Sequence, residues 1–165
     1  MTRSDIVKII MRDVRDDDIV VASTGYISRE VFRVMDRPLN FYMMGSMGNA
    51  LAIGIGLAMH LSQRVLVING DGSALMSLGT MVTARKLNLK NLMHIILDNN
   101  CHESTGGQKT ASDMIYFPSM GLNNLVSKIQ IDVADIPPRI PLSPKQITER
   151  FKNAIQVEAG IFVAK

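Results

Sequence analysis

The chain has 165 residues, with 18 lysines and arginines against 15 aspartates and glutamates, and 47% of its residues are hydrophobic. A net charge of +3, with no run of five basic residues and only 5% aromatic residues, argues against nucleic-acid binding. The single cysteine excludes a disulfide framework and a thiolate metal cage and favours a reducing cytoplasm, and no apolar stretch is long enough to cross a bilayer. We therefore expect one domain over residues 1–165, with neither a membrane nor a nucleic acid as its partner.

Short apolar runs alternate with longer helical segments along the chain, which is typical of an α/β domain with a parallel sheet. Because the apolar runs do not alternate with polar residues, we expect helices on both faces of the sheet. The predicted fold class is therefore a three-layer, open, mostly parallel sheet. The expected elements in chain order are strand Ile19–Ala22, helix Ser28–Met35, strand Asn40–Met43, helix Asn49–Ser62, strand Val65–Ile68, helix Ala74–Leu87, strand Leu92–Leu97, helix Pro144–Val157 with Ser143 as its N-cap, and a closing strand Ile161–Ala164.

The segment from Cys101 to Arg139 shows no long periodic pattern. It contains a Gly-Gly pair and several prolines, so we expect it to be a long loop. Loops of this length in a compact domain are usually functional or mobile.

Two polar motifs directly follow predicted strands. Residues 70–73 (GDGS) follow one strand, residues 98–100 (DNN) follow the next, and 26 residues separate Gly72 from Asn99. If the two strands are neighbours, both motifs emerge at the carboxyl edge of the sheet, where open α/β sheets bind ligands. The glycines allow the backbone to approach a phosphate, and the Asp71 carboxylate with an asparagine amide oxygen suits Mg²⁺. The pattern predicts a diphosphate ester bridged to Mg²⁺.

A GDG motif followed at this spacing by NN resembles the cofactor motif of thiamine diphosphate-dependent enzymes. The resemblance extends to residues 45–48 (GSMG), 97–108 (LDNNCHESTGGQ), 23–25 (STG) and 28–30 (SRE), and it covers about residues 19 to 110. In these segments the sequence is similar to the cofactor-binding domains of the decarboxylase branch that acts on sulfopyruvate and phosphonopyruvate.

The resemblance implies roles for the residues that match its motifs. The Gly45 carbonyl would accept a hydrogen bond from the cofactor's aminopyrimidine, and Met47 would be the apolar wedge that holds the cofactor bent. The cofactor-binding residues that we expect all belong to these motifs: Thr24, Gly25, Gly45, Ser46, Met47, Gly70, Asp71, Gly72, Ser73, Asn99, Cys101, Glu103 and Ser104.

The metal ligands and one catalytic candidate also follow from the resemblance. Asp71 would bind Mg²⁺ together with an asparagine and a backbone carbonyl. Asn99 with the Cys101 carbonyl is the preferred pair, and Asn100 with the His102 carbonyl is the other registration. His102 is the candidate for a catalytic proton-transfer role.

In this family a glutamate from a pyrimidine-binding domain activates the cofactor, and no residue of this sequence matches it. The resemblance therefore implies a partner α subunit carrying that domain, in a hetero-oligomer of αβ units. This chain would be the β subunit of a decarboxylase for a small anionic 2-oxoacid. The expected reaction is 3-sulfopyruvate to sulfoacetaldehyde and CO₂, a step toward coenzyme M.

Two alternatives stay open at this point. The chain would serve a split phosphonopyruvate or other 2-oxoacid decarboxylase, or it would be a thiamine diphosphate-binding module without its own chemistry. The sequence does not separate sulfonate from phosphonate recognition, because both groups present three oxygens and negative charge.

Overall fold

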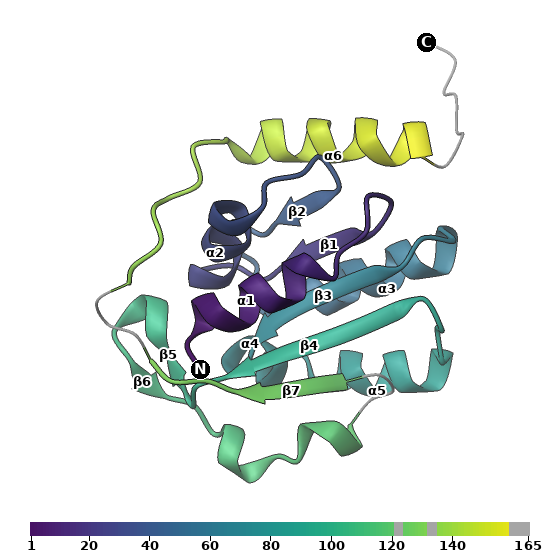
Figure 1. The fold of residues 1–165 in the computed structure, drawn as a ribbon. Helices are drawn as coiled ribbons and strands as arrows, with labels where there is room; N and C mark the ends of the chain where they lie inside the picture. Colours follow the sequence, from purple (N-terminus) through teal and green to yellow (C-terminus); the bar gives the residue numbers. More distant parts are fainter. Residues whose placement is uncertain (121–123, 132–134, 159–165) are drawn as a thin grey trace.

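The computed structural model describes residues 1–120, 124–131 and 135–158 (Figure 1). Its centre is a parallel sheet of five strands in the order β2-β1-β3-β4-β7. The strands are β1 (Ile19–Ala22), β2 (Asn40–Tyr42), β3 (Val65–Gly70), β4 (Leu92–Asp98) and β7 (Asn124–Lys128). The predicted α/β class with a parallel sheet is confirmed.

Helices cover both faces of this sheet, so the domain has three layers (Figure 1). Successive residues of β1 point into different cores: Ile19 and Val21 join one apolar cluster, and Val20 and Ala22 join the other. The helices are α1 (Arg3–Arg12) and α2 (Tyr26–Val34) on one face, α3 (Ala50–His60), α4 (Asp71–Met76) and α5 (Leu78–Leu87) on the other, and α6 (Pro144–Glu158) beside β2. No described helix is both long and apolar enough to span a membrane.

Smaller elements follow β4. A two-stranded antiparallel ribbon of β5 (Cys101–His102) and β6 (Gln108–Lys109) encloses the 3₁₀ turn η1 (Glu103–Thr105). Two further 3₁₀ turns, η2 (Ser112–Met114) and η3 (Phe117–Ser119), lead to β7. The expectation of a long loop from Cys101 to Arg139 was therefore wrong in part, because β7 completes the sheet beside β4.

Three other sequence predictions have different outcomes. Ser143 caps α6 as predicted: its hydroxyl accepts the N–H of Gln146 at 3.3 Å, and the Gln146 side chain accepts the N–H of Ser143 at 2.9 Å. The predicted helix Ala74–Leu87 is wrong as one element, because it starts at Asp71 and breaks at Ser77 into α4 and α5. The predicted closing strand, residues 161–164, lies outside the described residues.

Helix α1 was not predicted, although the sequence carries a signal for it. The Thr2 hydroxyl accepts the N–H of Asp5 at 3.2 Å, and the Asp5 carboxylate accepts the N–H of Thr2 at 2.9 Å. This capping box precedes apolar residues at helical spacing, of which Val7 and Met11 are fully buried. A threonine followed three residues later by an acidic residue was the signal that could have located this helix.

The two ends of the sheet differ in their chemistry. At the amino end, Arg64 pairs with Asp18 at 2.5 Å, and the Asp18 side chain is only 2% exposed. Burial by itself would raise the pKa of Asp18, but hydrogen bonds from Arg64 and from the Arg15 backbone hold it below its ordinary value of 3.8. At the carboxyl end, Gly70 of β3 lies beside Leu97 of β4. The GDGS and DNN motifs therefore leave neighbouring strands side by side, as predicted.

Helix α3 sits close against β3 because a glycine faces the strand. A Cβ atom added at Gly54 would lie 2.2 Å from Cγ2 of Val67, whereas one added at Gly56 would meet nothing within 4 Å. Gly54 thus sets the distance between the helix and the sheet, while Gly56 faces away from the core.

Candidate active site at the carboxyl edge of the sheet

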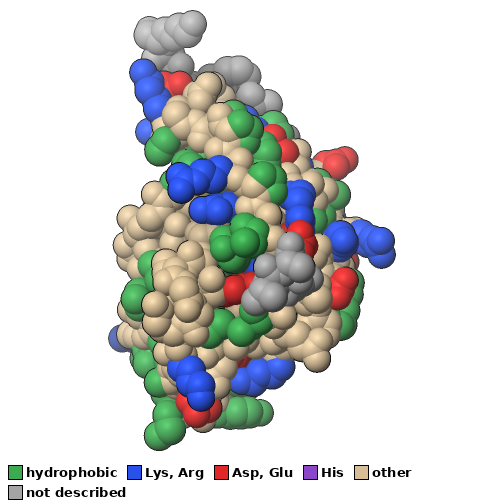
Figure 2. All heavy atoms as spheres, turned by 90° about the vertical axis from the view of Figure 1, so that its left-hand side faces the viewer, with side chains coloured by type: hydrophobic (Ala, Val, Ile, Leu, Met, Phe, Trp, Pro, Cys, Tyr) green, Lys and Arg blue, Asp and Glu red, His purple; other side chains and the backbone are tan. Residues whose placement is uncertain are grey.

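The loops at the carboxyl ends of β1, β3 and β4 surround one pocket, on the left-hand side of Figure 1. Figure 2 shows this face of the molecule, on which the described lysines and arginines are scattered and do not gather into one basic patch. The predicted site residues that line the pocket are Thr24, Met47, Gly70, Asp71, Ser73, Asn99, Cys101, His102, Glu103 and Ser104. Gly25, Gly45, Ser46, Gly72 and Asn100 are not among the lining residues, although Gly25 lies against the Ser104 side chain.

The loop of residues 45–48 (GSMG) is held at both ends by hydroxyl groups. The Thr24 hydroxyl accepts the N–H of Gly45 at 2.9 Å, and the Ser73 hydroxyl accepts the N–H of Gly48 at 3.0 Å. The backbone between these anchors is left-handed at Gly45, Ser46 and Gly48, with φ values of 117°, 50° and 94°. This turn places Met47 at the pocket wall with its side chain partly exposed.

Ser73 also belongs to a buried polar network beneath the pocket. Its hydroxyl receives a hydrogen bond from Ser23 at 3.0 Å and donates to the Asn69 side chain at 3.1 Å. The Asn69 amide in turn lies 2.9 Å from Nε2 of His94. Asn69 and His94 were not predicted as site residues. Their signal in the sequence is a polar residue inside an otherwise apolar strand.

Asp71 lies at the start of α4 and is 1% exposed. Its carboxylate accepts a hydrogen bond from the Thr110 hydroxyl, which also lies 3.3 Å from the Asn100 side-chain oxygen. Burial raises the pKa of Asp71 above its ordinary value of 3.8; the Thr110 hydrogen bond opposes that rise, and the nearby Asp98 carboxylate adds to it. The Thr110 hydroxyl thus lies close to both the Asp71 carboxylate and the Asn100 side-chain oxygen. Thr110 was not predicted as a site residue.

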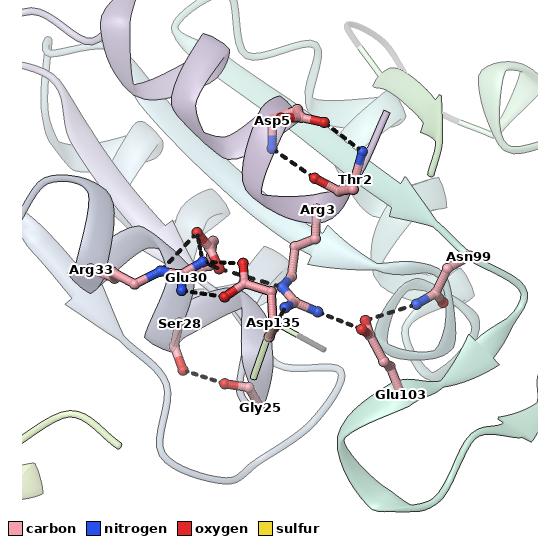
Figure 3. Close-up of polar contacts among 10 residues, drawn as sticks. All are labelled: Thr2, Arg3, Asp5, Gly25, Ser28, Glu30, Arg33, Asn99, Glu103 and Asp135. Carbon is pink, nitrogen blue, oxygen red and sulfur yellow. Dashed lines mark hydrogen bonds and ion pairs between the residues drawn. The ribbon is translucent and has the colours of Figure 1, made fainter. Parts of the chain in front are cut away.

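The loop after β4 is shaped by two successive side-chain turns. The Asp98 carboxylate accepts the N–H of Asn100 at 3.1 Å, and the Asn99 side-chain oxygen accepts the N–H of Cys101 at 3.2 Å. Asn100 is left-handed, with a φ of 58°. As a result, the Asn100 side chain faces Asp71 through Thr110, while the Asn99 amide turns toward Glu103 (Figure 3).

The His102 ring and the end of the Met47 side chain both lie close to Gly72. A Cβ atom added at Gly72 would lie 2.5 Å from Cε1 and 2.7 Å from Nδ1 of His102, and 3.1 Å from the terminal methyl of Met47. Only a glycine therefore allows this imidazole and this methionine to approach the start of α4 so closely.

Cys101 is buried at the strand end, beside acidic groups. Burial, with the Glu103 and Asp71 carboxylates, raises the pKa of its thiol above the ordinary value of 9.0. The thiol is therefore neutral near pH 7 and is not an activated nucleophile.

An open parallel sheet that gathers glycines, a carboxylate and amides at its carboxyl edge is the architecture of α/β domains that bind phosphate esters. A family model described as "Thiamine pyrophosphate enzyme, C-terminal TPP binding domain" matches residues 23–163. Because this match covers most of the chain, the chain belongs to the thiamine pyrophosphate enzymes.

Comparison with individual proteins shows which decarboxylases this chain is similar to. The chain is 38% identical to sulfopyruvate decarboxylase subunit beta of Methanocaldococcus jannaschii, over 99% of this chain and 82% of that protein. It is 39% identical to the subunit of the same name from Methanothermobacter thermautotrophicus, over 87% of this chain and 90% of that protein. Phosphonopyruvate decarboxylase of Streptomyces hygroscopicus is 48% identical over 101 residues, which are 61% of this chain and 25% of that protein.

A solved structure shows the same fold. It is that of a protein assigned as a thiamin diphosphate-dependent enzyme from Mycobacterium smegmatis, with a TM-score of 0.60 and 17% sequence identity. The match covers 79% of this chain and 31% of that chain. The likeness supports the α/β fold found here.

Proposed function

We propose that this chain is the β subunit of a thiamine diphosphate-dependent decarboxylase that converts 3-sulfopyruvate to sulfoacetaldehyde and CO₂, a step of coenzyme M biosynthesis. The observation that carries the proposal is the identity of 38% and 39% to two sulfopyruvate decarboxylase β subunits, over 99% and 87% of this chain. The pocket at the carboxyl edge supports it, since ten of the predicted site residues line that pocket.

The subunit names of the relatives support a partner. We propose that residues 1–165 form one cofactor-binding domain and that the pyrimidine-binding domain, with the glutamate that activates the cofactor, resides on a separate α subunit. The two chains would form a hetero-oligomer of αβ units. We place it in the cytoplasm, where a single unpaired cysteine such as Cys101 stays reduced.

Magnesium is the metal that the donor set fits best. Mg²⁺ prefers hard oxygen ligands and is often held jointly by a protein and a phosphate ligand. Asp71, Asn99 and Cys101 all line the pocket, so we propose the Asp71 and Asn99 side chains as ligands, with the Cys101 carbonyl as the third protein group. The other registration, Asn100 with the His102 carbonyl, is less favoured, because Asn100 does not line the pocket and its side-chain oxygen accepts hydrogen bonds from Thr110 and Ser112. Among the described residues no group of three or more His, Cys, Asp or Glu could hold a metal ion. The proposed site therefore relies on amide, carbonyl and diphosphate oxygens besides Asp71.

When bound, thiamine diphosphate supplies the electron sink for loss of CO₂. The residues of this chain would hold the cofactor and exclude water from it. Thr24 and Ser73 fix the loop that presents Met47, whose apolar side chain excludes water from one side of the pocket. His102, which lies against Gly72 next to Met47, is the residue to which we assign proton transfer to or from the substrate.

The test is a decarboxylation assay on the chain purified together with its partner subunit. We expect CO₂ release from 3-sulfopyruvate that depends on added thiamine diphosphate and Mg²⁺. Faster turnover of phosphonopyruvate would move the assignment to that substrate, which the 48% identity to a phosphonopyruvate decarboxylase makes the second candidate. Recovery of this chain as a homo-oligomer that binds the cofactor without turnover would overturn the decarboxylase and leave a binding module.

The metal assignment has its own test with a matched control. Asp71→Asn should abolish Mg²⁺-dependent cofactor binding in calorimetry, because it removes the buried carboxylate. Asp113→Asn changes an exposed aspartate of η2 and should leave the affinity unchanged. Equal affinities in the two variants would remove Asp71 from the site.

A further inference from the structure

Arg3 extends from the first turn of α1 into the wall of the pocket, with its side chain only 3% exposed (Figure 3). Its Nη1 lies 2.6 Å from Oε1 of Glu103, its Nε lies 3.6 Å from Oε2 of Glu30, and its Nη2 donates to the Asp135 carbonyl at 2.8 Å. The guanidinium also lies over the Tyr26 ring, 5.0 Å from its centroid. Every nitrogen of the guanidinium thus meets a different part of the chain.

Glu103 links Arg3 to the loop after β4. One carboxylate oxygen faces Arg3, and the other accepts a hydrogen bond from the Asn99 amide at 3.1 Å (Figure 3). Because the amide nitrogen of Asn99 is held there, its oxygen faces back and accepts the N–H of Cys101 at 3.2 Å. The direction of the Asn99 side chain, and with it the turn over residues 99–103, depends on where Glu103 is held.

We propose that Arg3 is a positioning residue for the cofactor loop: it holds Glu103, and through Glu103 it sets Asn99 and the turn that carries the diphosphate and metal groups. The proposal rests on the proposed function in one respect, namely that this pocket takes thiamine diphosphate. Arg3 lies outside residues 23–163, the part of the chain that the family model matches. Helix α1 therefore adds a component to the site that the matched domain does not include.

The chemistry of the ion pair favours a geometric role. A buried ion pair adds little net stability, because the cost of desolvating both charges offsets their attraction, whereas it strongly restricts where the paired groups can lie. A planar guanidinium restricts them more than an ammonium does, because its donors have fixed directions. The Nη2 group of Arg3 makes a hydrogen bond to the Asp135 carbonyl, which fixes the guanidinium, and its Nε and Nη1 groups form ion pairs with Glu30 and Glu103.

Arg33 provides a matched control within the same cluster. It lies 2.7 Å from Glu30 and 2.5 Å from Asp135, and its contacts in Figure 3 do not include Glu103. Arg3→Met and Arg33→Met each remove one guanidinium from Glu30 and Asp135. Only Arg3→Met removes the cation that pairs with Glu103.

Two measurements on the complex with the partner subunit test the proposal. In the first, the complex is stripped of cofactor and titrated with thiamine diphosphate in the presence of Mg²⁺. We expect the dissociation constant to rise about tenfold or more for Arg3→Met, as for other residues that orient a ligand group, and to stay near the wild-type value for Arg33→Met. Arg3→Lys keeps the positive charge but not the planar arrangement of donors, so its dissociation constant should lie between those of the two methionine variants.

The second measurement is hydrogen–deuterium exchange of the amides of residues 99–105 in the cofactor-free complex. We expect faster exchange in Arg3→Met than in Arg33→Met, because only the former releases Glu103. Equal exchange and equal cofactor affinity in the two variants would overturn the proposal. If the wild-type complex binds no thiamine diphosphate, the proposed function fails, and the exchange comparison still decides the role of Arg3.

Glu103→Gln keeps the test decisive if Arg3→Met does not fold. The glutamine retains an oxygen for the Asn99 amide but loses the charge that pairs with Arg3. We expect it to raise the dissociation constant of thiamine diphosphate about tenfold or more and to speed amide exchange over residues 99–105. A Glu103→Gln variant with wild-type affinity and exchange would overturn the proposal. Where Arg3→Met does fold, the double variant should show no further loss, and losses that add would show that Arg3 does not act through Glu103.

Discussion

The close approach of His102 and Met47 to Gly72 allows a quantitative prediction. A Cβ atom introduced by Gly72→Ala would lie 2.5 Å from Cε1 of His102. Carbon atoms that touch without repulsion are about 3.5–4.0 Å apart, so the imidazole must move by about 1 Å. Because the atoms in the way are the ends of the His102 and Met47 side chains and not backbone, we expect them to shift while the fold persists.

The free energies of unfolding and activation should respond differently. Alanine in place of glycine in a helix stabilises by about 1 kcal/mol, which offsets part of the crowding at Gly72. We therefore expect the free energy of unfolding to change by no more than about 1–2 kcal/mol. A displacement of about 1 Å at a reacting group costs about a hundredfold in rate, so turnover should fall by about that factor.

The assay compares the Gly72→Ala complex with a Gly79→Ala complex. Gly79 is an exposed residue of α5, and a Cβ added there would meet nothing within 4 Å. Gly79→Ala should keep wild-type turnover and gain up to about 1 kcal/mol in stability, measured by chemical denaturation. If Gly72→Ala turns over as fast as Gly79→Ala, the crowding at Gly72 does not control the positions of His102 and Met47, and the reasoning is refuted.

Three further predictions concern stability. Gly54→Ala should lower the free energy of unfolding by about 1–3 kcal/mol because its Cβ would clash with β3, while Gly56→Ala on the same helix should raise it slightly; equal effects in denaturation would contradict the packing. Ser73→Ala should cost about 1–3 kcal/mol, because it leaves the buried N–H at the end of the GSMG loop without its acceptor. Ser77→Ala, whose hydroxyl donates only to carbonyls of the preceding turn, should cost clearly less, and a comparable loss would argue against Ser73 as the anchor. The pKa of Asp18 is lower in the folded protein than its ordinary value of 3.8, so its contribution to stability is present above that value and is lost as pH falls through the folded-state pKa. Asp18→Asn should therefore reduce the loss in the free energy of unfolding as pH falls into the acidic range. If the variant and the wild type lose the same free energy over that range, the ion pair of Asp18 does not contribute.

The sequence by itself determined the class of fold and the place of the site. Runs such as Val65–Ile68, and Leu92–Leu97 apart from His94, are apolar because helices cover both faces of the sheet, and that local signal is visible without tertiary information. Once two such strands are neighbours and parallel, the motifs that follow them must meet at one edge. The pairing of β3 with β4 confirms that step.

Only the tertiary structure decided how the groups at that edge are held. Thr110 reaches Asp71 across 39 positions of the chain, and Arg3 pairs with Glu103, which lies 100 positions further along the sequence. Periodicity reports whether a residue is buried, but not which distant residue it meets. The orientations of Asn99 and Asn100 differ for the same reason, because each amide turns toward the partner that folding brings to it: Glu103 in one case and Thr110 in the other.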